Sequence, residues 1–202
     1  LGSAPNAMVQ NWLNTASDCA LLNANIGYDP SLADVIKMVH PKPASAEREA
    51  LCAWIVGRPC ELARLPQAVQ DWMAFKETGK GPVPDVPFQM LPQLELSSAH
   101  WARIARKGSW QMVRQNLNTF QRHGVFGVTK NVDHVAALLR NHEAIAKARA
   151  FPYQLMVAAQ HVNSEMPREI VDALHDAMEI AVQNVPKIAG QDVVSPDVSG
   201  SM

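Results

Sequence analysis

The sequence predicts an all-α protein made of HEAT-like antiparallel helical repeats. Apolar residues recur at helical spacing in one segment after another, and no segment shows the period-two alternation of a half-buried strand. Turns containing proline or glycine separate these segments, so each helix is short. Short amphipathic helices bury their apolar faces only by stacking on neighbouring helices, which is how repeat proteins are organised.

Composition places the chain among ordinary globular proteins. Its 202 residues are 48% apolar and 18% charged, which suits one substantial core or a short repeat array. The cysteines Cys19, Cys52 and Cys60 are odd in number and lack CxxC spacing, so we expect buried thiols in a reducing compartment. No apolar run approaches the ~18 residues that a membrane span needs, and residues 1–8 carry no secretory signal. We therefore expect a cytoplasmic protein that does not bind membranes.

Residues 29–43 are predicted to form one short helix with a defined start and end. Asp29 or Ser31 can cap its N-terminus by accepting backbone N–H bonds. Its apolar face consists of Leu32, Val35, Ile36 and Val39. Pro41 and Pro43 forbid continuation, so the helix must end just before them.

A helix that ends at about Val39 or His40 presents three nitrogen-bearing side chains near its C-terminus: Lys37, His40 and Lys42. Two interpretations of His40 are open on physical grounds. It can serve simply as the C-cap, facing the negative end of the helix dipole. Alternatively, it is held for contact with a ligand, because two prolines fix the path by which the chain leaves the helix.

Further helices are expected along the rest of the chain. Residues 9–25 are predicted to form one or two helices, and the segments 45–56 and 62–75 one each. Residues 78–92 contain six glycines and prolines and are predicted to form a long ordered loop packed by its apolar side chains. Three later helices are expected, one capped by Asp133, one begun by Pro152, and one running from about residue 164 to Val185.

The stretch from Leu96 to Val132 is predicted to be an electropositive surface on two helices that meet at Gly108–Ser109. It contains six cations and no Asp or Glu, in a chain whose formal net charge is −1. The cations are Arg103, Arg106, Lys107, Arg114, Arg122 and Lys130, and the second helix is expected to bury Trp110, Val113, Leu117 and Phe120. With Asn118 and Gln121 beside them, such side chains suit phosphate oxygens. The alternative is an ordinary solvated face whose acidic partners lie on neighbouring helices.

The last residues, from Asp192 to Met202, differ from the rest of the chain. Asp197, Ser199 and Ser201 form a D-x-S-x-S motif after a β-branched pair of valines. A carboxylate and two hydroxyls are hard oxygen ligands of the kind that Mg²⁺ prefers. Taken alone, however, a chain end rich in serine and glycine is more often simply disordered.

Three segments, in this order, give the chain a resemblance to a known family. They are D-P-S-L-A-D-V-I-K-M-V-H-P-K-P at residues 29–43, A-R-A-F-P-Y-Q-L at residues 148–155, and D-V-S-G-S-M at residues 197–202. The sequence resembles the Ro ring proteins of the bacterial type, whose α-helical part is called the TROVE module. The resemblance implies a TROVE-type helical region over residues 1–190 and the start of a von Willebrand A-type domain over residues 191–202.

The resemblance also implies that the chain is a fragment. It begins with Leu1 rather than Met and stops at Met202 inside that second domain. Ro proteins have further helices before this region and a complete von Willebrand A-type domain after it. The metal site begun by Asp197, Ser199 and Ser201 takes its remaining ligands from later loops, so we expect Mg²⁺ in the full-length protein and negligible binding here.

The functional implications of the resemblance concern RNA. In the family, the histidine at the position of His40 is implicated in binding small structured RNAs called Y RNAs, and an exoribonuclease is the partner in RNA quality control or maturation. The expected RNA-binding residues are His40, Lys42, Lys37, Arg103, Arg106, Lys107, Arg114 and Arg122, with no DNA ligand expected. Asn23 and Asn25 stand where Ro proteins can carry basic RNA contacts, so contacts there are expected to be weaker or absent.

A helical-repeat scaffold that binds other proteins is the alternative function. Repeat arrays usually bind peptides or domains, and adhesion-type metal sites recruit protein ligands. An enzyme is not expected, because the sequence offers no nucleophile–base pair and no complete metal cage. Salt dependence separates the two binding functions, since only phosphate neutralisation gives a steep slope.

Overall fold

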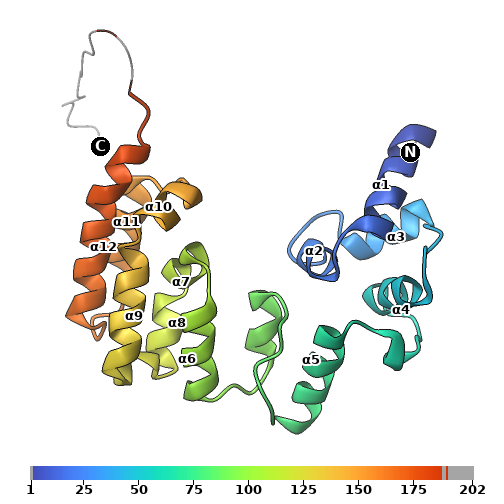
Figure 1. The fold of residues 1–202 in the computed structure, drawn as a ribbon, viewed down its shortest axis with the longest axis horizontal. Helices are drawn as coiled ribbons and strands as arrows, with labels where there is room; N and C mark the ends of the chain where they lie inside the picture. The colour runs from blue at the N-terminus through green and yellow to red at the C-terminus, as the bar shows by residue number, and fades with distance from the viewer. Residues whose placement is uncertain (1, 188–189, 191–202) are drawn as a thin grey trace, which may run out of the picture. The chain divides into compact units, whose positions relative to one another are not determined.

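The computed structural model describes residues 2–187 and 190, and none of these residues forms a strand. Short helices follow one another along the whole described chain (Figure 1). The predicted all-α, helical-repeat fold class is therefore confirmed. By its internal contacts the chain divides into two units, residues 1–104 and 105–202, with the boundary inside one helix. The expected domain boundary at residues 190 and 191 lies at the edge of the described chain and stays a prediction.

Unit 1 contains the N-terminal helices. They are α1 (Ser3–Thr15), α2 (Asp18–Ala24), α3 (Leu32–Val39), α4 (Ala46–Ile55), α5 (Gln67–Thr78) and the start of α6 (Ser98–Lys107), with two 3₁₀ helices, η1 (Leu62–Arg64) and η2 (Phe88–Gln93). Serine side chains cap four of these helices, and the cap of α6 is Ser97, whose Oγ accepts the backbone N–H of His100 at 3.3 Å. The Oγ atoms of Ser17, Ser31 and Ser45 each accept a hydrogen bond of 3.2 Å from the backbone N–H three residues later. Such caps satisfy donors that a helix start leaves unpaired, which explains why helices this short begin where they do.

The segment between α5 and α6 is a packed loop, as predicted. The indole Nε1 of Trp72 donates a 3.1 Å hydrogen bond to the carbonyl oxygen of Met90, and both side chains are buried. Phe88 packs edge-on against Trp101, with 6.3 Å between the ring centroids. The structure adds one detail to the prediction, because the end of this segment winds into η2.

Unit 2 contains the rest of the described chain. Its helices are α7 (Trp110–Gln115), α8 (Leu117–Arg122), α9 (Thr129–Leu139), α10 (His142–Ala148), α11 (Pro152–His161) and α12 (Arg168–Ala181), with the 3₁₀ helices η3 (Val125–Gly127) and η4 (Val182–Asn184). Helix α12 packs against α9, α10 and α11. Its inner face carries Ile170, Ala173, Leu174 and Ala177, all with 0% exposure, so the core of this unit lies along α12.

Two helix boundaries in unit 2 differ from the prediction. The single helix expected after Ser109 is broken at Asn116. The side-chain Nδ2 of Asn116 donates to the carbonyl oxygen of Met112, and its backbone N–H donates to the carbonyl oxygen of Val113. A side chain that competes for backbone groups in this way interrupts a helix. Asp133 is not a cap, because α9 already begins at Thr129. Buried Asn131 fixes that earlier start by donating to the carbonyl oxygen of Val125 in η3.

Candidate functional site

Helix α3 ends where its sequence predicted, and hydrogen bonds fix both its start and its end. At the start, Ser31 and Asp34 form a reciprocal capping box, in which the Asp34 carboxylate accepts the Ser31 backbone N–H at 3.3 Å. Hydrogen bonds from Ser31 lower the pKa of the exposed Asp34 carboxyl below its ordinary value. At the other end, the N–H of His40 donates to the carbonyl oxygen of Ile36 at 3.0 Å.

His40 is the C-cap of α3, and it adopts the left-handed backbone conformation with φ 48° and ψ 59°. Histidine is one of the few residues besides glycine that populate this region, at some energetic cost. The capping role uses only the backbone, since the imidazole itself is exposed. The two interpretations of His40 are therefore compatible, because the residue caps the helix and still presents its side chain outward.

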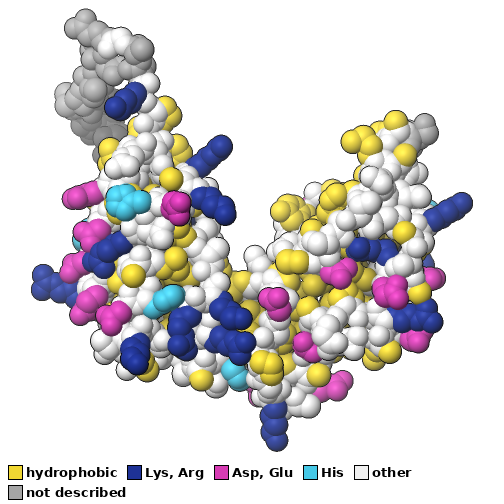
Figure 2. Space-filling model, viewed as in Figure 1, with side chains coloured by type: hydrophobic (Ala, Val, Ile, Leu, Met, Phe, Trp, Pro, Cys, Tyr) yellow, Lys and Arg dark blue, Asp and Glu magenta, His cyan; other side chains and the backbone are white. Residues whose placement is uncertain are grey.

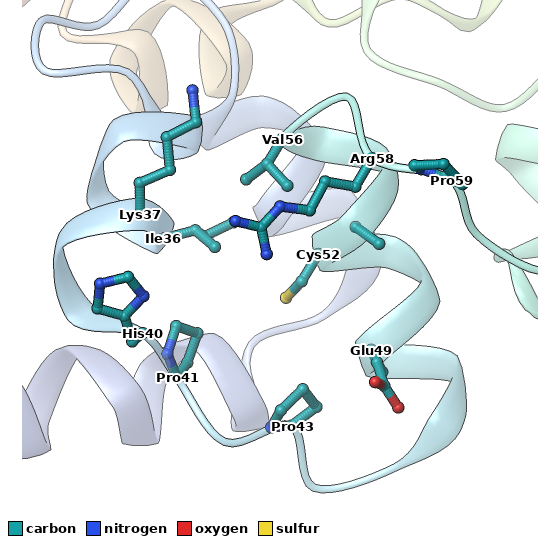
Figure 3. A pocket seen from close by; sticks show the side chains of 11 residues that line it. Ile36, Lys37, His40, Pro41, Pro43, Glu49, Cys52, Val56, Arg58 and Pro59 are labelled. Atoms are coloured by element: carbon teal, nitrogen blue, oxygen red, sulfur yellow. The ribbon is translucent and has the colours of Figure 1, made fainter.

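The imidazole faces a pocket between α3 and α4, which we call the α3–α4 pocket. Its volume is about 390 Å³, and it is lined by Ile36, Lys37, His40, Pro41, Pro43, Glu49, Cys52, Ala53, Val56, Arg58 and Pro59. In Figure 3 the Arg58 guanidinium extends toward α3 between Lys37 and His40, whereas Glu49 lies at the far end of the pocket. Two cations and an imidazole thus gather on one side of the pocket.

Arg58 was not among the residues expected at a site. It follows Gly57, whose φ of 74° turns the chain at the end of α4, and its own N–H donates to the carbonyl oxygen of Ala53 at 2.8 Å. The signal available in the sequence was an arginine between a glycine and a proline. What the sequence could not supply is the packing of α4 on α3, which carries Arg58 to the side of Lys37 and His40.

The polar groups of the pocket favour binding over covalent chemistry. The side chains of Lys37, His40 and Arg58 are exposed, and within the described residues none of them forms a hydrogen bond or an ion pair. Burial raises the pKa of the Cys52 thiol, an effect that the nearby Arg48 guanidinium partly opposes. A thiol held protonated at neutral pH is a poor nucleophile. The free cations, in contrast, remain available for an external anion.

Lys42 does not line the pocket, although it lies on the segment that leaves it. This segment is tied to α1 by Asn14, whose Nδ2 donates to the carbonyl oxygen of Lys42 at 3.0 Å. The Oδ1 atom of the same side chain accepts the N–H of Ala44 at 2.9 Å. The Lys42 side chain is exposed, so it remains accessible beside the fixed backbone.

The cations of residues 96–132 are placed in two different ways. Lys and Arg side chains gather over α6, as Figure 2 shows, and Arg103, Arg106 and Lys107 on that helix are exposed. Arg122 and Lys130 are also exposed. Arg114 is instead half-buried. Its Nη1 donates to the carbonyl oxygen of Gln154 at 3.1 Å, and its guanidinium lies 5.6 Å from the Trp110 ring.

Burial lowers the pKa of Arg114, and its Nε atom is buried without a hydrogen-bond partner in the part of the chain that the structure describes. The neighbouring amides also have internal partners. Asn118 donates to the carbonyl oxygen of His161 at 2.8 Å, and Gln121 donates to that of Glu165 at 3.0 Å. Arg114 therefore joins α7 to the first turn of α11, whereas Asn118 and Gln121 join α8 to the end of α11 and the turn that follows it.

The predicted metal ligands Asp197, Ser199 and Ser201 lie outside the described residues. Among the residues that are described, no group of three or more His, Cys, Asp or Glu side chains could hold a metal ion. Likewise, no helix in residues 2–187 is both long enough and apolar enough to cross a membrane.

Comparison with known proteins supports the fold. No family model matches the sequence, and no curated protein matches it. The crystal structure of the Deinococcus radiodurans Ro (RSR) protein superposes on this chain with a TM-score of 0.63 and 20% sequence identity. The chain has a Ro-type fold. The match covers 92% of this chain and 42% of the Deinococcus protein, so the chain spans less than half the length of that Ro protein.

Proposed function

We propose that this chain binds small structured non-coding RNA, of the Y-RNA kind, in RNA quality control or maturation. The observation that carries the proposal is the α3–α4 pocket, where the side chains of Lys37, His40 and Arg58 are exposed and form no hydrogen bond or ion pair with the described residues. The Ro-type fold and the three sequence segments shared with Ro proteins support the same function. A cytoplasmic location and an exoribonuclease partner belong to this proposal.

The side chains of the pocket contact different parts of the RNA, according to their chemistry. Lys37 and Arg58 neutralise phosphate oxygens, for which a guanidinium can provide two parallel N–H donors. His40 stacks on a base or donates to a backbone oxygen, because its position at a fixed helix end orients the ring. Lys42, and the exposed cations Arg103, Arg106, Lys107 and Arg122, add phosphate contacts or long-range attraction.

The proposed role is binding rather than catalysis. Cys52 is the thiol of the pocket, and burial holds its pKa above the ordinary value. Lysine, arginine and histidine side chains in an open pocket can hold a phosphodiester without a nucleophile to attack it. RNA cleavage in the proposed pathway then belongs to the exoribonuclease partner.

The test is the salt dependence of RNA binding, measured by anisotropy with a fluorescent bulged RNA hairpin. Lys37→Ala and Arg58→Ala should each reduce the slope of log affinity against log salt by roughly one unit. Arg168→Ala is the matched control, because Arg168 is an exposed arginine on α12 and should leave the slope unchanged. Duplex DNA of the same length should bind more weakly than the hairpin.

Two outcomes would overturn the proposal. Slopes that do not change in either pocket variant would show that phosphate does not enter the α3–α4 pocket. Hairpin binding that is weak and insensitive to salt in the unaltered protein would favour the protein-interaction scaffold instead.

A further inference from the structure

Unit 1 contains a second pocket that shares no lining residue with the α3–α4 pocket. Its volume is about 330 Å³, and its walls include Asn25, Trp54, Trp72, Gln89 and Gln93. We call it the tryptophan pocket. The seven described residues that line it carry no charge, in contrast to the cationic wall of the α3–α4 pocket. A pocket of this size is in the range that small organic ligands occupy.

Two indole rings form the aromatic part of the tryptophan pocket. The Trp54 and Trp72 rings meet edge to face, with centroids 6.3 Å apart and an interplanar angle of 81°. Trp72 is buried. Its indole donates to the carbonyl oxygen of Met90, and the Lys76 ammonium lies 5.0 Å from its ring centroid, so the ring is fixed in place. Trp54 is only half-buried, so part of its ring surface is free to receive another flat ring.

Three carboxamides complete the wall of the pocket. The side chains of Asn25, Gln89 and Gln93 make no hydrogen bond with any described residue. Other amides of the chain are engaged, such as Asn131 with the carbonyl oxygen of Val125 and Asn184 with that of Ala150. Each free carboxamide offers one acceptor and two donors to a ligand.

We propose that the tryptophan pocket binds a nucleobase, with the base stacked on Trp54 and its edge hydrogen-bonded by the carboxamides of Asn25, Gln89 and Gln93. A neutral lining does not favour a charged ligand, whereas a base is flat, uncharged and rich in edge donors and acceptors. A carboxamide pairs its donor and acceptor with adenine, which presents both on one edge. Stacking on aromatic side chains is the usual way that proteins hold bases outside a duplex.

The base can come from single-stranded RNA or from a free nucleotide. In the first case the inference deepens the RNA-binding function proposed above and rests on it. Titration of the protein with adenosine monophosphate and with a short oligoadenosine, followed by tryptophan fluorescence, separates the two sources. Tighter binding of the oligoadenosine identifies single-stranded RNA, and equal affinity identifies the free nucleotide.

The main experiment compares a blunt RNA hairpin with the same hairpin carrying a short single-stranded adenosine tail. Trp54→Ala should reduce affinity for the tailed hairpin by about five- to hundredfold, the range for losing one stacked base, and should leave the blunt hairpin unaffected. Trp54→Phe should retain most of the affinity. The salt slope should not change, because no phosphate contact is removed.

Two further variants test whether an effect of Trp54→Ala is due to loss of the stacking ring or to unfolding of the protein. Gln89→Ala combined with Gln93→Ala alters only exposed side chains, so it should weaken tail binding without unfolding the protein. Trp12→Ala removes a different exposed tryptophan, 41% accessible on α1, and should have no effect on either RNA. A tail that adds no affinity, or Trp54 and glutamine variants that bind both RNAs like the unaltered protein, would overturn the inference.

The results also distinguish this inference from the proposed function. If Lys37→Ala and Arg58→Ala weaken the hairpin while the Trp54 variants change nothing, the RNA-binding function stands and the base site fails. If the hairpin does not bind but oligoadenosine quenches tryptophan fluorescence through Trp54, the base site stands and the proposed function fails.

Discussion

The α3–α4 pocket and the helix pair α7 and α8 both bring cationic or amide side chains together, yet these side chains have different partners. The side chains of Lys37 and Arg58 in the pocket make no ion pair or hydrogen bond with the described residues. Arg114, Asn118 and Gln121 instead donate to backbone carbonyl oxygens of α11 and of the turn that follows it. From the sequence, RNA-binding residues are expected in both regions, with Lys37 in one and Arg114 in the other. Only the structure shows which polar side chains are already satisfied and which are free.

The largest expected effect tests the internal role of Arg114. Arg114→Ala should lower the free energy of unfolding by about 2–3 kcal/mol, because it removes a charged hydrogen bond and a contact with the Trp110 ring. Chemical denaturation measures this change. Arg122→Ala, at an exposed position nearby, should change it by less than about 0.5 kcal/mol. Unchanged stability with a reduced salt slope in Arg114→Ala would instead give Arg114 a phosphate contact and remove the contrast between the two regions.

His40→Gly separates the cap from the imidazole. Glycine adopts the left-handed conformation of residue 40 without steric cost, so the helix end should persist while the side chain is lost. We expect about a tenfold loss of affinity for a small structured RNA, equivalent to about 1.4 kcal/mol, with helical content and salt slope almost unchanged. His40→Ala is a less clean variant, because alanine is strained in that conformation.

A matched control exists at Arg149, the other described residue besides glycine with a positive φ, also 48°. Arg149→Gly makes the same backbone change at the end of α10, and it should leave recognition of one RNA over another intact. If His40→Gly binds RNA as well as the unaltered protein does, His40 acts only as a cap.

The N-cap of α3 is the next test, because it carries the start of the helix that positions His40. Ser31→Ala should reduce the free energy of unfolding by about 1 kcal/mol, the usual cost of losing a serine cap. RNA affinity should fall much less, since the binding side chains lie at the opposite end of α3. A variant with normal stability would show that packing of Leu32, Ile36 and Val39 alone sets the start of the helix.

The smallest expected effect concerns pH and Asp34. Hydrogen bonds from Ser31 lower the pKa of Asp34 in the folded protein, so the ionised carboxylate favours folding. This contribution is present above the ordinary aspartate pKa of about 3.9, and it is lost as the pH falls through the lowered folded value. The stability difference between the unaltered protein and Asp34→Asn should therefore shrink in acid. A difference that is constant with pH would contradict the assignment.

The parts of the fold that the sequence predicted depend on local chemistry. Ser31, Pro41 and Pro43 fix the limits of α3 through groups within a few residues, and both the helix and the position of His40 followed from them. The same holds for α11, which begins at Pro152 as expected. Caps, prolines and helical periodicity act over one or two turns, so their effects can be derived from neighbouring residues.

What the sequence could not show depends on contacts between distant segments. Arg58 reaches the site only because α4 packs on α3, and Arg114 is engaged by a carbonyl oxygen 40 residues away. The free carboxamides of the tryptophan pocket come from the C-cap of α2 and from η2, and no sequence pattern brings them together. The helices that carry Lys37, Arg103 and Arg114 could thus be predicted, but the partners of these side chains could not be inferred.

The two hydrogen bonds that Asn14 makes with the segment after His40 affect hydrogen–deuterium exchange in that segment. Pro41 and Pro43 have no N–H groups, and the N–H of Ala44 donates to Asn14 on α1. The amide proton of Ala44 is therefore protected only while α1 remains docked, and its exchange with deuterium should report the opening of α1. Helix α1 contributes no residue to the lining of the α3–α4 pocket, yet through Asn14 it holds the segment that follows His40, so opening of α1 should also loosen that segment.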